Sequence, residues 1–270
     1  MLNIKDISKT FNPGTPDEVQ AIKHVSLAVP DGAFVVVIGT NGSGKSTLQQ
    51  LIAGACIPDS GRIELAGEDI TRWGEHRRAA LIGRVFQNPF SGTAPTLSII
   101  ENMALAARRG QCRGLGWLLS GAVRRRLRDR VAELGMGLED RLDNAIGSLS
   151  GGQRQALTLL MAVLQRPSLL LLDEHTAALD PKASDQVIRL TRDIVAREKL
   201  TTVMVTHSMH QAAHLGDRLI MMVNGEIRQD LADERKRRVN VEDLLALFEQ
   251  VRRADRLDAS AAELLRSRYV

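Results

Sequence analysis

The sequence predicts an α/β fold in which a mostly parallel sheet carries a phosphate-binding loop. We expect an antiparallel sheet beside the parallel one and a helical arm inserted into the chain. The first observation is the stretch Gly39–Thr47, which reads GTNGSGKST and fits the pattern of a P-loop. The apolar run Val35–Ile38 precedes it and the stretch Leu48–Ala53 follows it, so the loop connects a buried strand to a helix as that motif requires. The second observation is the alternation of strand and helix patterns along the chain, which is typical of a parallel sheet covered by helices.

The other strands follow from apolar and polar residues that alternate along the chain. In the N-terminal part we expect an antiparallel sheet from Leu2–Ile7, Ala21–Val29 and Gly61–Ala66. The C-terminal half predicts, in order, a strand, a helix, a strand and a hairpin with an Asn-Gly turn. These span Ser168–Leu172, Lys182–Lys199, Thr201–Val205 and Asp217–Ile227.

Between residues 88 and 165 the pattern becomes mainly helical, and we expect an inserted helical arm. Apolar residues recur there about every four positions, with arginines on the other face of the same helix. The apolar positions are Val123, Leu127, Val131 and Leu134.

The P-loop predicts that the protein binds a nucleoside triphosphate. Its glycines let backbone N–H groups face phosphate oxygens, and the helix that follows adds the positive end of its dipole. Lys45 is expected to reach the β- and γ-phosphates, and the hydroxyl of Ser46 to ligate Mg²⁺. The expected phosphate-binding residues are Gly39, Thr40, Asn41, Gly42, Ser43, Gly44, Lys45, Ser46 and Thr47.

Composition predicts a soluble cytosolic protein. Apolar residues make up 44% of the chain and charged residues 25%, which is ordinary for a globular domain. No apolar run approaches the roughly 18 residues that a membrane span needs, and the N-terminus lacks the build of a signal peptide. Cys56 and Cys112 have no metal-ligand spacing and suggest no disulfide framework.

The positive charge is concentrated in one stretch. Residues 108–130 hold eight arginines against a single acid, Asp129, whereas the whole chain carries a net charge of only +4. Aromatic residues, at 3%, are too scarce for base stacking, so we expect no nucleic-acid partner. Two interpretations of the arginine stretch stay open: a solvated helical face, or a surface that meets a membrane partner or anionic headgroups.

Two acidic residues follow the strand that is predicted at Leu169–Leu172. Leu169–Leu172 is apolar throughout and delivers Asp173 and Glu174 at its end. Asp173 is placed to hold Mg²⁺ through its water shell, and Glu174 to polarise a water for in-line attack on the γ-phosphorus.

Several further motifs, in one fixed order, make the chain resemble the ATP-binding-cassette (ABC) ATPases over roughly residues 1–230. The hallmark is Leu149-Ser-Gly-Gly-Gln153 together with the P-loop and the Asp173–Glu174 strand. The matching positions outside this hallmark are Gln87 in Phe-Gln-Asn-Pro (the Q-loop), Ala178-Leu-Asp180 (the D-loop) and His207 after Val-Thr (the switch histidine). His175 stands where the family commonly has proline, and we expect no catalytic role for it.

The resemblance implies a RecA-like core, an antiparallel β subdomain and a helical subdomain over about residues 88–165. It also implies that two cassettes enclose two ATP molecules, each P-loop facing the signature of the other copy. Glu174, His207 and Gln87 would then act in catalysis, and Ser46, Gln87 and Asp173 at Mg²⁺. Further nucleotide contacts would come from Phe11, stacked on adenine, and from Ser150, Gly151, Gly152, Gln153 and Asp180.

Residues 231–270 are predicted to form a short helical tail outside the cassette. Asn240 could cap a helix, and Ser260 begins a capping-box pattern for another. The apolar stripe expected on the first helix comprises Val241, Leu244, Leu245, Phe248 and Val251. Whether these helices pack on their own core or contact another protein stays open.

The resemblance to the family leads us to expect the ATP-hydrolysing subunit of a membrane transporter. Pro95–Asn102 resembles a phrase common in bacterial transport cassettes, and the run from Asp173 to Pro181 resembles cassettes assigned to amino-acid transport. The expected partners are a second cassette, integral membrane permease subunits and a solute-binding protein, with the chain peripheral on the inner face of the cell membrane. The alternative is a soluble cassette acting in an assembly such as iron–sulfur cluster biogenesis. A binding module that only changes shape with ATP is disfavoured by the presence of Glu174 and His207.

Overall fold

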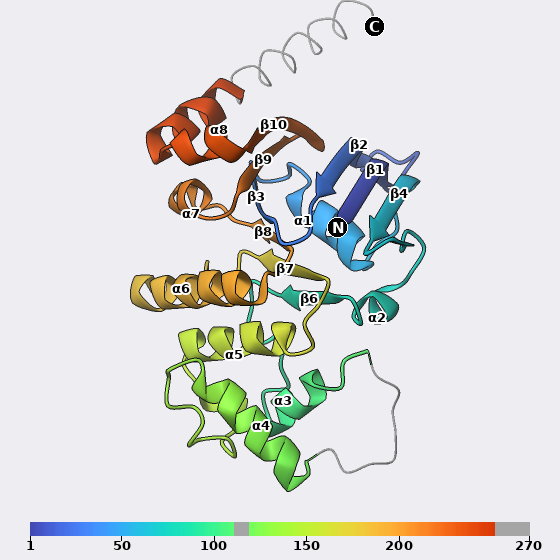
Figure 1. Ribbon diagram of the computed structural model, residues 1–270. Coiled ribbons are helices and arrows are strands. Elements are labelled where there is room, and N and C mark those ends of the chain that lie inside the picture. Colours follow the sequence, from blue (N-terminus) through green and yellow to red (C-terminus); the bar gives the residue numbers. More distant parts are fainter. Residues whose placement is uncertain (111–118, 252–270) are drawn as a thin grey trace, which may run out of the picture.

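The computed structural model of the chain describes residues 1–110 and 119–251. Within them, two β-sheets lie next to each other, and a helical arm extends from the larger sheet (Figure 1). The expected α/β architecture, with its antiparallel sheet and inserted helices, is confirmed.

The larger sheet has six strands in the order β10-β9-β3-β8-β7-β6. All neighbouring strands run parallel except β10 and β9, which form the predicted hairpin. Its turn, Asn224-Gly225, places both residues at positive φ, as a two-residue hairpin turn requires. The strands are β3 (Phe34–Gly39), β6 (Ile82–Val85), β7 (Leu169–Asp173), β8 (Thr202–Val205), β9 (Arg218–Val223) and β10 (Glu226–Ala232).

Helices cover both faces of this sheet. On one face, α1 (Lys45–Ala53) packs Leu48 and Leu51 with Val35 and Val37 of β3. On the other face, α5, α6 and α7 pack with the alternate residues of β3, such as Val36. These helices are α5 (Gly151–Val163), α6 (Pro181–Glu198) and α7 (Met209–His214). Because successive strand residues point to opposite faces, α1 and α5 are separated by the sheet.

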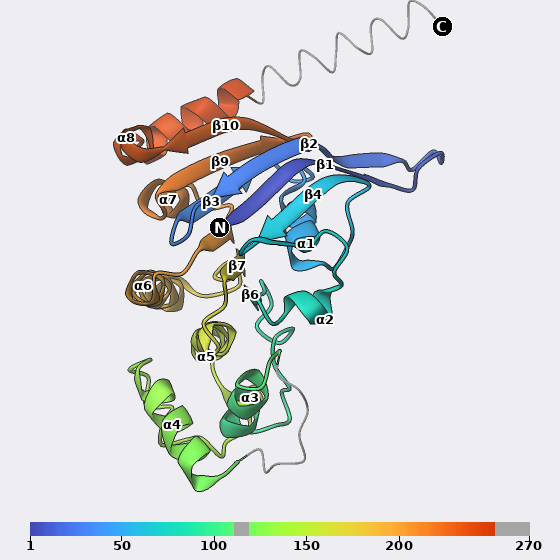
Figure 2. The same cartoon turned by 45° about the vertical axis from the view of Figure 1, so that its right-hand side comes forward.

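The smaller sheet is antiparallel, in the order β2-β1-β4-β5, and it covers α1 from the outside (Figure 2). Apolar residues of its inner face belong to the same core cluster as Leu48 and Val35, so α1 lies between the two sheets. The strands are β1 (Leu2–Phe11), β2 (Val19–Val29), β4 (Ser60–Leu65) and β5 (Glu68–Asp69).

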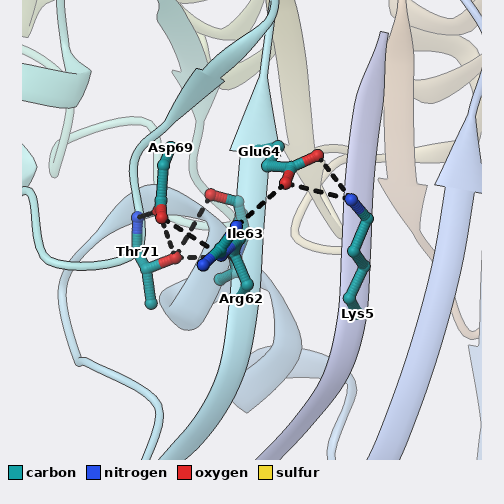
Figure 3. A network of polar contacts seen from close by, with 6 residues as sticks. All are labelled: Lys5, Arg62, Ile63, Glu64, Asp69 and Thr71. Carbon is teal, nitrogen blue, oxygen red and sulfur yellow. Dashed lines mark hydrogen bonds and ion pairs between the residues drawn. The ribbon is translucent and has the colours of Figure 1, made fainter.

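A polar network holds β1, β4 and the turn after β5 in register (Figure 3). Lys5 of β1 donates to both carboxylate oxygens of Glu64 on β4, at 3.0 and 2.9 Å. The hydroxyl of Thr71 accepts from the N–H of Ile63 at 2.9 Å and donates to Asp69 at 2.5 Å. The exposed Lys5–Glu64 pair contributes a few tenths of a kcal/mol, whereas the buried bond from Ile63 to Thr71 fixes the turn after β5 against β4.

The short helix α2 (Glu75–Arg78) was not predicted, and it carries a fully buried arginine. The guanidinium of Arg78 donates to four backbone carbonyls: those of Leu51, Ile52, Thr71 and Trp73. Two of these belong to the last turn of α1, where a cation also complements the helix dipole. Arg78 therefore joins α1 to the antiparallel subdomain.

The arm consists of α3 (Ile99–Ala106), α4 (Gly121–Ala132), a 3₁₀ turn (Ile146–Ser148) and α5. The predicted apolar face of α4 is confirmed, since Leu127 and Val131 are fully buried in the core cluster that includes α5. A capping box between Ser98 and Glu101 begins α3.

Within the described residues, three of the eight arginines in the stretch form ion pairs with acidic side chains. The ion pairs are Arg124–Asp143 at 2.5 Å, Arg128–Asp140 at 2.7 Å and Arg130–Glu198 at 2.9 Å. Arg109 donates inward to the carbonyl of Ala162 at 2.7 Å, and Arg113 lies outside the described residues. This pairing supports the interpretation of the stretch as a solvated helical face.

The C-terminal segment packs against the core. After β10 come α8 (Asp233–Arg238) and a helix over residues 241–251, which Asn240 caps by accepting from the N–H of Asp243 at 2.8 Å. Leu244 of that helix is fully buried, but the predicted stripe was wrong at Leu245, which is 47% exposed. Leu247 packs against the core in its place. The second expected tail helix, beginning near Ser260, lies outside the described residues.

Candidate functional site

The P-loop lies between β3 and α1, as predicted, and its conformation depends on glycine. Gly44 has φ of 97°, and a Cβ there would lie 2.5 Å from the carbonyl oxygen of Ala21. The loop is tied to the β9–β10 turn, because the N–H of Gly225 donates to the carbonyl of Ser43 at 3.1 Å. No side chain larger than hydrogen fits at Gly44, and the loop backbone stays open to a bound anion.

Lys45 turns back over the loop. Its Nζ donates to the carbonyls of Gly39 and Thr40, at 3.0 and 2.7 Å, and to the hydroxyl of Ser43 at 3.3 Å. Burial lowers the pKa of Lys45, and this effect is opposed by the nearby carboxylates of Glu174 and Asp173. The ammonium is thus held at the phosphate-binding loop and within electrostatic reach of both acids.

Asp173 and Glu174 come together with the P-loop at the carboxyl edge of the parallel strands. Asp173 is the last residue of β7, and α1 is tied to that strand because Nε2 of Gln49 donates to the carbonyl of Leu172 at 2.9 Å. Burial raises the pKa of Asp173; Arg84 opposes this rise and Glu174 adds to it. The carboxylate of Asp173 therefore lies among both cationic and anionic groups, with Arg84 3.9 Å away.

Glu174 and His207, predicted to act together, are in direct contact. Nε2 of His207 lies 2.6 Å from Oε1 of Glu174. Glu174 adopts φ of 43°, and its N–H donates to the carbonyl of Val205 at 3.0 Å, so the backbone aims the side chain from β7 toward the end of β8. Residues held in such a conformation cluster at functional sites.

Gln87 lies in an exposed loop after β6, and within the described residues no hydrogen bond or ion pair joins its side chain to Glu174 or His207. The loop is fixed from behind by α5, because Nε2 of Gln155 donates to the carbonyl of Phe86 at 3.2 Å. Next to it lies a groove of about 510 Å³ between β6, α3 and α5. Its lining includes Arg84, Phe86 and the half-exposed Leu105.

The signature residues begin α5, as the capping pattern requires. Ser150 accepts from the N–H of Gln153 at 3.3 Å, and Oε1 of Gln153 accepts from the N–H of Ser150 at 3.2 Å. Arg154 holds the preceding turn by donating to the carbonyls of Gly147 and Leu149, at 2.8 and 2.9 Å, and its guanidinium stacks 3.8 Å from the ring of Phe90. The side chain of Gln153 therefore serves the helix cap.

The signature does not meet the P-loop of the same chain. The two belong to helices on opposite faces of the sheet, with β6 and β7 between them in both views (Figures 1 and 2). Two further predicted nucleotide-binding residues belong to other elements. Asp180 caps α6 by accepting from the N–H of Ala183 at 3.0 Å, and Phe11 at the end of β1 is 37% exposed.

Two further side chains hold the site from behind: His175, for which the sequence predicted no catalytic role, and Gln211, which the sequence did not single out. His175 is buried, its Nε2 lies 3.0 Å from the hydroxyl of Thr191, and burial lowers its pKa to about 4. Gln211 bridges two threonines beside the Glu174–His207 contact. The signal that could have found Gln211 is its position in the first turn of the helix that follows His207, but the pattern does not reveal its partners.

The donor set fits Mg²⁺ bound with a triphosphate. The hydroxyl of Ser46 and the carboxylate of Asp173 are hard oxygen donors, and Mg²⁺ in such sites keeps several waters and takes further oxygens from the phosphates. The described residues contain no group of three or more His, Cys, Asp or Glu that could hold a metal alone. These two donors would leave the remaining ligand positions of the ion to phosphate oxygens and waters.

Known proteins resemble the chain over most of its length. A family model described as ABC transporter matches residues 22–177. A tyrosine transport ATP-binding protein of Clostridioides difficile (strain R20291) is 43% identical over 251 residues, which cover 92% of this chain and 99% of that protein. The lipoprotein-releasing system ATP-binding protein LolD of Ruegeria pomeroyi is 34% identical over 230 residues, covering 84% of this chain and 96% of that protein.

Among solved structures, the dimeric post-hydrolysis state of the ATP-binding cassette MJ0796 bound to ADP and Pi is similar at a TM-score of 0.73 and 28% identity. It covers 86% of this chain and 98% of that chain. In the described part of this chain, no helix has the length and apolar character that crossing a membrane requires.

Proposed function

The chain belongs to the ABC transporter family, and from that premise we propose that it powers the import of an amino acid or a similar small solute. The family assignment makes it the ATP-hydrolysing, ATP-binding subunit of a membrane transporter. The proposal of an amino acid rests on the relative named for tyrosine transport, which matches this chain almost from end to end. The named relatives favour a transporter over the alternative of a soluble assembly ATPase.

We assign the nucleotide contacts residue by residue. The backbone of Gly39–Thr47 holds the phosphates, Lys45 reaches the β- and γ-phosphates, and Phe11 stacks on adenine. Ser46 and Asp173 hold Mg²⁺, with Gln87 approaching it when the exposed loop closes. The ion supplies positive charge that offsets the charge of the phosphates. Lys45 supports this assignment because its ammonium already lies on the loop, bonded to carbonyls that a phosphate would outcompete.

Hydrolysis is assigned to the contact between Glu174 and His207. Glu174 accepts a proton from the water as the water attacks the γ-phosphorus in line with the leaving oxygen. His207 orients the carboxylate and the water, because its Nε2 is 2.6 Å from Oε1. This contact is the observation that carries the proposed mechanism.

Catalysis is proposed to need two copies of the chain. The sheet separates α5 from the P-loop, so Ser150, Gly151 and Gly152 cannot complete the site of their own subunit. A second copy that faces the first would bring its α5 N-terminus to the γ-phosphate, where the N–H groups and the helix dipole attract negative charge. Asp180 would lie at the same interface.

The membrane partner is proposed to dock in the groove beside the Gln87 loop. The groove is lined mainly by apolar side chains, and Phe90 and Leu105 are exposed next to or within it. Such a patch suits an amphipathic segment of a permease subunit. Docking there would place the chain on the inner face of the membrane, with a solute-binding protein on the other side.

Uptake and co-purification test this proposal. Source cells that lack the gene would be complemented with the wild type, Glu174→Gln or Leu105→Glu, and uptake of labelled tyrosine would be measured. We expect tyrosine uptake with the wild type only. In the co-purification, we expect a multi-span protein to be recovered with ATP-loaded Glu174→Gln but not with Leu105→Glu. Recovery of soluble assembly factors alone would overturn the transporter. Recovery of the membrane protein without tyrosine uptake would overturn only the solute.

A further inference from the structure

The side-chain amide of Gln211, in the helix that follows His207, bridges the two loops of the catalytic pair. Its Oε1 accepts from the hydroxyl of Thr206 at 2.8 Å, and its Nε2 donates to the hydroxyl of Thr176 at 2.9 Å. Thr206 precedes His207 directly, and Thr176 follows Glu174 by two positions. One amide therefore joins the loop that carries the base to the loop that carries the histidine.

The two threonine hydroxyls of this bridge are buried from solvent. Thr176 is 6% exposed and Thr206 is 3% exposed, so little water competes for their hydroxyls. Thr206 also accepts from the N–H of Ser208 at 3.1 Å, which fixes the backbone on the far side of His207. Loss of the Gln211 amide would leave buried threonine hydroxyls without a hydrogen-bond partner. The two loops would then have to move for these hydroxyls to find another partner.

A lysine from the C-terminal segment anchors the helix on which Gln211 stands. Nζ of Lys236, in α8, donates to the carbonyl of Ala213 at 2.6 Å, and Lys236 is only 3% exposed. Ala213 lies in the last turn of α7, so the ammonium meets a carbonyl that lacks a partner within the helix and the negative end of its dipole. Leu244, beyond α8, is buried in the core cluster that also contains Ala212 of α7.

We propose that Gln211 is a positioning residue for Glu174 and His207, and that Lys236 of the C-terminal segment holds α7 so that Gln211 can act. The inference rests on the proposed roles of Glu174 and His207. It gives the segment after β10 a part in ATP hydrolysis that the cassette motifs do not assign to it. Because neither Gln211 nor Lys236 touches the P-loop, their loss should reduce turnover without weakening ATP binding.

Substitutions at Gln211 test the bridge. Gln211→Leu keeps the size of the side chain but removes both hydrogen bonds, and we expect kcat to fall about tenfold or more with KM for ATP changed less than about twofold, as for displaced catalytic groups. Gln211→Glu should restore kcat to near the wild-type value, because a carboxylate can accept from both threonine hydroxyls. Thr176→Val should match Gln211→Leu, and the double variant should be no slower than either.

Substitutions in α8 test the anchor. Lys236→Met should lower kcat severalfold at unchanged KM, while Arg237→Met, an exposed neighbour on the same helix, should leave kcat at the wild-type value. Combined with Gln211→Leu, Lys236→Met should add little, because both act through α7. Thermal melting of each variant, with and without ATP, separates this effect from a general loss of folded protein.

Glu174→Gln and His207→Ala, measured in the same assay, separate a failure of the proposed catalytic pair from a failure of the positioning role of Gln211. If both slow hydrolysis but Gln211→Leu does not, the positioning role is wrong and the proposed catalytic pair stands. If Gln211→Leu raises KM in place of lowering kcat, the bridge serves ATP binding and the inference is also wrong. If Glu174→Gln hydrolyses ATP at the wild-type rate, the catalytic roles themselves fail.

Discussion

Nε2 of His207 lies 2.6 Å from Oε1 of Glu174, although the two residues come from the ends of different strands. Their strands, β8 and β7, are parallel neighbours, so both side chains emerge at the same edge of the sheet. A histidine at this distance restricts the carboxylate to one orientation. It also gives the pair a means of ordering a water beside a bound γ-phosphate.

His207→Ala is expected to reduce kcat for ATP hydrolysis by about 100-fold, the usual range for losing a group that takes part in proton transfer. ATP affinity should stay near the wild-type value, because His207 does not contact the P-loop in the structure. Steady-state hydrolysis and equilibrium ATP binding, measured on the same preparation, check both parts. A large loss of affinity would instead make His207 a binding residue.

Lys45→Met is expected to weaken ATP binding by about 100-fold or more, since charge-assisted hydrogen bonds to phosphate are among the strongest a side chain makes. Titration calorimetry with ATP and Mg²⁺ measures the change. Lys182→Met, at an exposed position of α6, provides the matched control for the loss of one positive charge. Equal affinities for the two variants would contradict the assignment of Lys45.

Arg78→Met should lower the free energy of unfolding by about 3 kcal/mol, because it leaves buried carbonyls without their donor. The guanidinium keeps its charge at neutral pH, as burial lowers the pKa of Arg78 only to about 10. Arg78→Lys should recover only part of the loss, since one ammonium cannot span four carbonyls. Urea denaturation of the three proteins gives the values, and a loss within about 0.5 kcal/mol of zero would refute the role of Arg78.

His175 predicts a pH-dependent stability. Its pKa is about 4 in the folded protein, below the ordinary value of about 6.5, so the unfolded chain binds the extra proton first as the pH falls. The part of the free energy of unfolding that depends on neutral His175 is fully present above pH of about 6.5. It is lost as the pH falls toward 4, and the loss reaches roughly 2 kcal/mol at a pH of about 5.

His175→Leu removes this titration, while the hydroxyl of Thr191 keeps the carbonyl of Val187 as its acceptor. Between pH of about 7.5 and 5, the variant should therefore lose roughly 2 kcal/mol less stability than the wild type. Denaturation at the two pH values, in buffer without nucleotide or divalent cations, gives this difference. Identical losses in both proteins would mean that His175 does not titrate as a buried group.

Local patterns predicted most of the fold. The P-loop, the buried strands and the hairpin turn depend on residues close together in sequence, and the structure places them within a few residues of the predicted bounds. These features depend on information that one segment carries by itself. That Glu174 and His207 share a site was expected from the resemblance of the ordered motifs to the ABC ATPases, since the two residues come from different segments.

Contacts between distant segments were not predictable in this way. The sequence shows eight arginines near one another, but not that Asp143, Asp140 and Glu198 lie opposite three of them. Leu245 and Leu247 are equally apolar, and only the angle at which their helix packs decides which of them packs against the core. Gln211 and Arg78 were missed for the same reason, because their partners come from other elements.

The most direct test of the account is Glu174→Gln, assayed for ATP turnover and for ATP-dependent dimerisation with Mg²⁺. The amide keeps the shape of the side chain but cannot accept the proton of the attacking water. We expect turnover to fall about 100-fold or more, together with a stable ATP-bound dimer that light scattering detects and that Lys45→Met does not form. Wild-type turnover by Glu174→Gln would contradict the central claim that this carboxylate, completed by a second copy of the chain, performs hydrolysis.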